Sequence, residues 1–69
     1  MNLASVDTIT FVDLGSGDNA LAIVRASPGQ IAFCISLAGN GDVEVVFGPT
    51  ECERILNALR SACLIAEGA

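Results

Sequence analysis

The stretch AGNGDVEVVFGPTECERILNALRSA, residues 38–62, places a glycine-rich turn, a strand pattern and a helix pattern in direct succession. Up to Phe47 the apolar residues follow the period of about 2 that is typical of a strand. After Phe47 they recur every three or four positions, which is the spacing of one helix face. This change of period predicts a strand over 43–47 and a helix over 49–66.

The start of this helix has two interpretations. If Gly48 is the N-cap, Pro49 takes the first helical position, where its missing N–H costs nothing. If Thr50 is the N-cap, Glu53 completes a capping box. In both cases one helix face is apolar and consists of Cys52, Ile55, Leu56, Leu59, Ala62, Cys63 and Ala66.

Three more apolar runs precede this stretch, DTITFVDL, ALAIVRA and IAFCISL, and the turn signals GSGDN, SPGQ and AGNGD follow them in that order. Closely spaced runs rich in Val, Ile, Phe and Thr predict an antiparallel meander with strands over about 6–14, 20–26, 30–37 and 43–47. The predicted fold class is therefore α+β: a four-stranded antiparallel β-meander with one C-terminal helix packed on one face (ββββα). The chain is expected to form a single domain, residues 1–69.

Strand register follows if the turns are centred near Ser16, Pro28 and Asn40, because residues opposite each other share a sheet face. All the large side chains then lie on the face that packs against the helix, and Asp7 lies opposite Arg25 as a charge pair. The second face is small and weakly polar, which is unusual for a solvated sheet. It is interpreted as a self-association or partner interface, with a tolerated apolar monomer surface as the alternative. The candidate interface residues are Thr10, Ala22, Val24, Ala32, Cys34 and Val46.

The composition also favours association. The 69-residue chain is 52% hydrophobic but only 4% aromatic, and it contains no Trp, Tyr, His or Lys. A core of this size rarely supplies more than about 3–5 kcal/mol without a disulfide, a metal or a partner chain. Leu64 and Ile65 lie off the apolar helix face, where they either contact a neighbouring chain or cover the open end of the sheet. We therefore expect a homodimer or a larger homo-oligomer.

The net charge of −5 excludes two common classes of partner. Binding to nucleic acid or to an anionic membrane surface needs clustered Lys and Arg, and the chain has only three basic residues. The N-terminal residues lack a basic segment followed by an apolar one, so they do not have the pattern of a signal peptide. These features predict a cytoplasmic protein that binds neither nucleic acid nor a membrane.

The chemistry-bearing residues do not form a recognisable catalytic or metal motif. A Ser or Cys nucleophile needs a nearby base, and the chain has no His and no Lys. A carboxylate pair drawn from Asp13, Asp18, Asp42 or Glu44 is formally possible, but acids in turns are usually solvated. We expect no catalytic residues, no enzyme activity, no metal and no cofactor.

Two further motifs have simple structural interpretations. The spacing of Cys34, Cys52 and Cys63 matches neither a zinc site nor a CxxC motif, so three free, buried thiols are expected. GSGDN, residues 15–19, could cradle a phosphate with its backbone N–H groups, but it precedes a strand pattern rather than a helix pattern. It is more simply a hairpin loop.

The order of elements is similar to that of small dimeric single-stranded-DNA-binding domains of the transcriptional coactivator type, although no motif is shared. The resemblance supports the fold but not the function, because the strands offer Arg25 without Trp or Tyr. In size and acidity the chain also resembles accessory proteins of phages and other mobile elements, many of which inhibit a host protein or sequester a small molecule.

The leading hypothesis is a non-enzymatic, homo-oligomeric interaction module that binds and inhibits another protein. The alternative is a protein that binds or sequesters a nucleotide or metabolite in a pocket between protomers, because one chain of this size has little room for both a core and a cavity.

Overall fold

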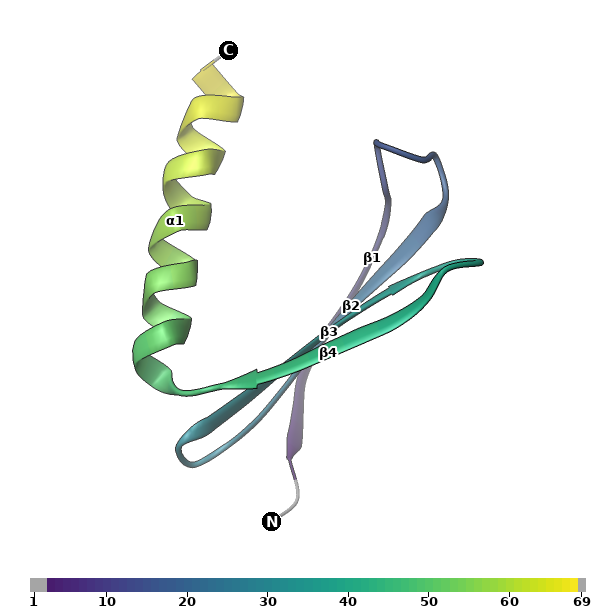
Figure 1. Cartoon of the computed structure of the whole chain (residues 1–69). Helices are drawn as coiled ribbons and strands as arrows, with labels where there is room; N and C mark the ends of the chain where they lie inside the picture. Colours follow the sequence, from purple (N-terminus) through teal and green to yellow (C-terminus); the bar gives the residue numbers. More distant parts are fainter. Residues whose placement is uncertain (1–2, 69) are drawn as a thin grey trace.

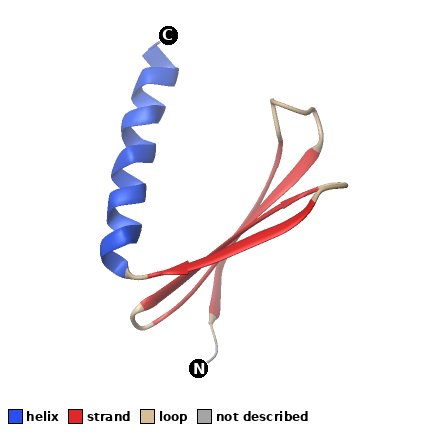
Figure 2. Cartoon of the chain, viewed as in Figure 1, coloured by secondary structure: helices blue, strands red, loops and turns tan. Residues whose placement is uncertain are grey.

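The computed structural model describes residues 3–68 and consists of one antiparallel sheet followed by one helix (Figures 1 and 2). The elements are β1 (Ala4–Val12), β2 (Asn19–Ser27), β3 (Gln30–Leu37), β4 (Gly41–Phe47) and α1 (Pro49–Gly68). The strands lie in the order β1-β2-β3-β4, so each one pairs with its neighbour in sequence. The predicted ββββα fold is confirmed.

The first two turns contain even numbers of residues. The first loop spans residues 13–18, and the second turn consists of Pro28 and Gly29 alone. Proline fixes φ at about −65°, and Gly29 has a φ of 83°, which together are typical of a type II turn. A turn centred on one residue, as predicted at Ser16 and Pro28, contains an odd number. The register is therefore shifted by one residue at each of these turns.

Together, the two register shifts move the side chains of β2, and of no other strand, to the face opposite the predicted one. A shift of one residue moves every side chain of a strand to the opposite face, so Phe11 lies opposite Ala20 rather than Leu21. The second shift cancels the first, and β3 therefore presents the predicted faces. The third loop, residues 38–40, shifts the register by two residues and leaves the faces of β4 as predicted.

We call the face that α1 approaches the inner face and the opposite one the outer face. The inner face comprises Asp7, Ile9, Phe11, Ala20, Ala22, Val24, Ala26, Ile31, Phe33, Ile35, Leu37, Val43, Val45 and Phe47. The outer face comprises Thr8, Thr10, Val12, Asn19, Leu21, Ile23, Arg25, Ala32, Cys34, Ser36, Asp42, Glu44 and Val46. Ala22 and Val24 were predicted on the small-residue face and lie on the inner face instead, so that part of the prediction is wrong.

The ion pair of the sheet also differs from the prediction. Asp7 lies opposite Val24 on the inner face, so it does not pair with Arg25. Arg25 instead donates a hydrogen bond to the carboxylate of Glu44. Arg25 lies opposite Ala32, and Glu44 lies opposite Cys34, so the ion pair crosses β3. Small side chains on β3 leave space for this bridge.

A single residue, Gly48, connects the sheet to α1. Its N–H donates to Oε1 of Glu51 at 3.1 Å, and its carbonyl oxygen accepts from the N–H of Cys52 at 3.0 Å. Gly48 is therefore the N-cap and Pro49 the first helical residue, as in the first of the two interpretations.

The helix diverges from the sheet as it proceeds towards its C-terminus (Figure 1). None of the residues of α1, Pro49–Gly68, is buried. Within residues 3–68 the buried side chains belong to Ala20, Ala22 and Ala32. The radius of gyration is 13.6 Å, whereas a compact chain of this length has a value of about 11 Å. The two layers are thus only partly packed together.

The ion pair provides a test of the register. A double-mutant cycle with Arg25→Ala and Glu44→Ala should give a coupling free energy of about 0.2–1 kcal/mol, because the two side chains are 39% and 41% exposed. The measurement is urea unfolding at low salt. The same cycle with Asp7→Ala in place of Glu44→Ala should give no coupling. A measurable coupling free energy between Arg25 and Asp7 would contradict the observed register and support the one predicted from the sequence.

Candidate functional site: an apolar cleft between helix and sheet

A cleft of about 320 Å³ lies between the first turns of α1 and the inner face of the sheet. Its walls are formed by Val24, Ile31, Phe33, Val45, Phe47, Cys52, Ile55, Leu56 and Leu59. The thiol of Cys52 is the only side-chain heteroatom in these walls. The cleft therefore offers contact with apolar groups and almost no hydrogen bonding.

The inner face continues beyond this cleft without cover. Ile9 is 49% exposed and Val43 is 69% exposed. On α1, Leu64 and Ile65 are more than two-thirds exposed, so they do not cover the open end of the sheet within one chain. Monomeric proteins rarely expose large contiguous apolar patches unless another surface binds there.

In the uncovered part of the inner face, β2 carries small side chains between the larger ones of β1 and β3, and we call this strip the trough. Its floor consists of Ala20 and Ala22, which are small and buried between larger neighbours. Its walls are Ile9 and Phe11 from β1 and Ile35 and Leu37 from β3. This trough is the consequence of the exchanged faces of β2, because the predicted register would place Leu21 and Ile23 here.

The surface area of the whole chain agrees with this picture. The protein exposes 5227 Å². A folded monomer of 7.0 kDa is expected to expose about 4,000 Å². The excess of about 1,200 Å² is comparable with the area that one partner buries in a stable protein interface, which is about 800 Å² or more.

The outer face holds the other predicted interface residues. Thr10, Ala32, Cys34 and Val46 lie there as predicted. No observation tests their role in binding, so that role stays a prediction. The small residues of β3 on this face, Ala32 and Cys34, lie between Arg25 and Glu44 of the ion pair, and the alanines of β2 lie on the inner face.

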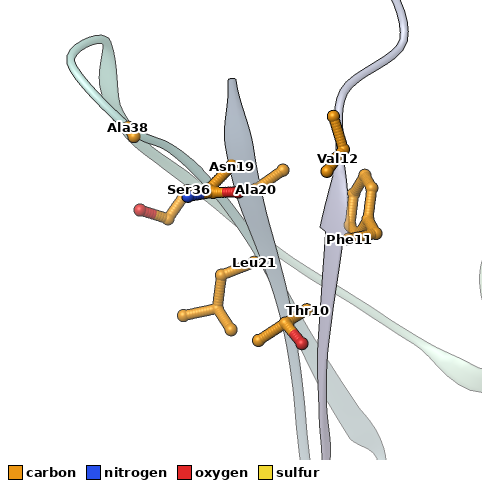
Figure 3. Close-up of a pocket in the computed structure, with 8 residues that line it drawn as sticks. All are labelled: Thr10, Phe11, Val12, Asn19, Ala20, Leu21, Ser36 and Ala38. Carbon is orange, nitrogen blue, oxygen red and sulfur yellow. The ribbon is translucent and has the colours of Figure 1, made fainter. Parts of the chain in front are cut away.

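A shallow depression lies at the end of the sheet where β1 and β2 meet their loop (Figure 3). Its lining combines Thr10, Leu21 and Ser36, which form one row of the outer face, with residues of the strand ends and the inner face. Figure 3 shows Thr10 and Leu21 on one side of the strands and Phe11 on the other. The depression thus lies at the strand ends and includes residues of both faces, and no charged side chain lines it.

The carboxylate of Asp13 accepts hydrogen bonds from its own loop, residues 13–18. Asp13 accepts hydrogen bonds from the N–H groups of Gly15 and Ser16 at 3.3 and 3.2 Å, and from the Ser16 hydroxyl at 2.7 Å. The hydrogen bond from the Ser16 hydroxyl contributes most to lowering the pKa of Asp13 below its ordinary value. The N–H groups that could cradle a phosphate thus have partners within the loop, since those of Gly15 and Ser16 bind this carboxylate and those of Gly17 and Asp18 bind the Asp13 carbonyl and the Ser16 hydroxyl. This arrangement favours the hairpin-loop interpretation.

The three thiols are free but not equally covered. Cys34 and Cys52 are half-buried and Cys63 is exposed, so the thiols are free as predicted, but the prediction that they are buried is wrong. Among residues 3–68, no three side chains of His, Cys, Asp or Glu gather as metal ligands do.

In residues 3–68, no helix combines the length and the apolar character that crossing a bilayer needs.

Comparisons with known proteins found no similar family model, no similar curated protein and no similar solved structure.

The loop gives a prediction about pH. Ser16→Ala should raise the pKa of Asp13 towards its ordinary value of 3.8, because the largest cause of the lowered pKa is removed. In the wild-type protein, the stabilisation by these hydrogen bonds is fully present above that ordinary value and is lost as the pH falls through the lowered pKa. Titration of the Asp13 carboxyl carbon by NMR measures both pKa values. Equal values in the two proteins would contradict the assigned hydrogen bonds.

Proposed function

We propose that the protein is a non-enzymatic interaction module that functions as a homo-oligomer and inhibits another protein by binding to it. The observation that carries the proposal is the uncovered apolar inner face, together with the excess surface area of the chain. Apolar surface on this scale stabilises a protein only when another protein surface covers it and removes it from water.

The character of the cleft favours a protein over a small molecule as its occupant. Binding sites for metabolites combine apolar walls with a few polar groups that orient the ligand. The walls of this cleft contain no oxygen or nitrogen side-chain atoms. A nucleotide or a polar metabolite would lose its hydrogen bonds to water there without replacement.

The charge of the chain suggests the character of the inhibited partner. The net charge is −5, and most of the acidic residues are exposed. Charge complementarity accelerates association with a basic surface and disfavours acidic ones. The partner is therefore a protein with a basic binding surface, and the association rate decreases as salt is added.

The proposal is tested by quantitative affinity capture from the cell in which the protein functions. The immobilised chain should enrich one protein in near-stoichiometric amount. Val46→Arg should reduce this enrichment at least tenfold, because Val46 is an exposed apolar residue of the outer face. Asn57→Arg provides a matched control, since it adds the same charge on the polar side of α1.

Two results would count against the proposal. One is capture of no protein beyond those retained by an unrelated acidic chain. The other is a large increase in thermal stability with a nucleotide or metabolite library, which would favour the ligand-sequestering alternative.

A further inference from the structure

We infer that the trough along β2 is covered by α1 of a second copy of the chain. In this arrangement two protomers related by a two-fold axis each place the C-terminal half of α1 on the inner face of the other. The inference rests on the proposed homo-oligomeric function and identifies the surface that produces it.

The dimensions of the trough suit a helix. β1 and β3 lie on either side of β2, so the trough walls are separated by two strand spacings, about 10 Å. This is a spacing between backbones, and the wall side chains make the open width smaller than the diameter of an α-helix, so a row of helix side chains rather than the whole helix fits between the walls. The floor of Ala20 and Ala22 lets a helix approach closely. Larger side chains at these two positions would fill the space.

The free half of α1 is complementary to the trough. Ile55 and Leu59 face the sheet of their own chain across the cleft. The same helix face continues with Ala62, Cys63 and Ala66, which are exposed and have no sheet residues opposite them in the cleft. Small residues on a helix permit a close fit against a ridged surface. The apolar face is thus divided into a half that packs within the chain and a half that is free.

The area supports a second copy as the occupant. Each chain contributes a trough and a free helix half, so a dimer with a two-fold axis pairs the trough of each protomer with the helix half of the other. If each protomer buries its excess surface, the dimer interface amounts to about 2,400 Å² in total, which lies in the range of about 2,000–5,000 Å² for permanent homodimers.

Cysteine cross-linking between two differently tagged chains tests the inference. One chain keeps Cys63 and carries Cys34→Ser and Cys52→Ser. The other carries Cys34→Ser, Cys52→Ser and Cys63→Ser together with Ile9→Cys, on the inner face. After the chains are mixed and refolded, a short bismaleimide should join them in more than half of the mixed dimers. Any cross-link between the two tags is necessarily between chains.

The matched control replaces Ile9→Cys by Thr10→Cys. Thr10 is the next residue of β1, is exposed, and lies on the outer face. It should cross-link at least tenfold less. Equal or greater cross-linking at Thr10 would overturn the inference and make the outer face the interface. No cross-linking at either position would overturn it as well.

Light scattering gives an independent measurement without cysteines. The wild-type chain should have twice its mass of 7.0 kDa. Val43→Glu, on the inner face, should raise the dissociation constant at least 100-fold, whereas Val46→Glu, on the outer face of the same strand, should change it less than threefold. A monomeric wild-type chain, with α1 closed on its own sheet, would overturn the inference.

These results are separate from the capture experiment. A chain that dimerises through the outer face and still captures a protein contradicts the inference but supports the proposed function. A chain that dimerises through the trough and captures nothing supports the inference but contradicts the proposed inhibition of another protein.

Discussion

The rest of the structure depends on a mismatch between one helix and one sheet face. The inner face carries the large apolar residues of β1, β3 and β4, and within residues 3–68 only α1 is available to cover them. Gly48 is the only connection, so the first turn of α1 begins at the edge of the sheet beside Phe47. From there the helix diverges, as Figure 1 shows. A single chain therefore buries only part of its apolar inner face, so only part of the available hydrophobic stabilisation is realised.

Small side chains occur on both faces of the sheet, and they have a different structural role on each face. On β3 the small side chains of Ala32 and Cys34 lie under the bridge from Arg25 to Glu44. On β2 the small side chains of Ala20 and Ala22 form the floor of an apolar trough. The first pair accommodates a contact within the chain, whereas nothing within the described chain covers the second. Only the neighbours across the strands distinguish these two cases.

Element order was predictable from the sequence because it depends on local signals. The strand patterns, the turn residues and the change of period at Phe47 each act over a few residues.

The face of β2 was not predictable in the same way, since its residues alternate Ala20, Leu21, Ala22 and Ile23, and both faces of this strand are apolar. Its register depends on whether each turn contains an odd or an even number of residues. The Pro28-Gly29 pair carried that signal, because proline followed by glycine fits the two central positions of a type II turn. The bridge from Arg25 to Glu44 depends in turn on the register, so it was missed for the same reason.

Folding and association are closely coupled in a chain with this arrangement. The buried side chains within residues 3–68 are three alanines, and alanine contributes little hydrophobic stabilisation compared with Leu, Ile or Phe. Most of the stabilising contacts available to Ile9, Phe11 and the free half of α1 therefore lie outside the single chain. In the proposed dimer, the apolar inner face serves the stability of the fold, because a partner that binds only the folded state raises its stability by mass action. In the same proposal, the outer face and the loops remain for recognition of a different molecule. A small chain can separate these two tasks because a sheet has two faces, and alternation along each strand assigns every residue to one of them.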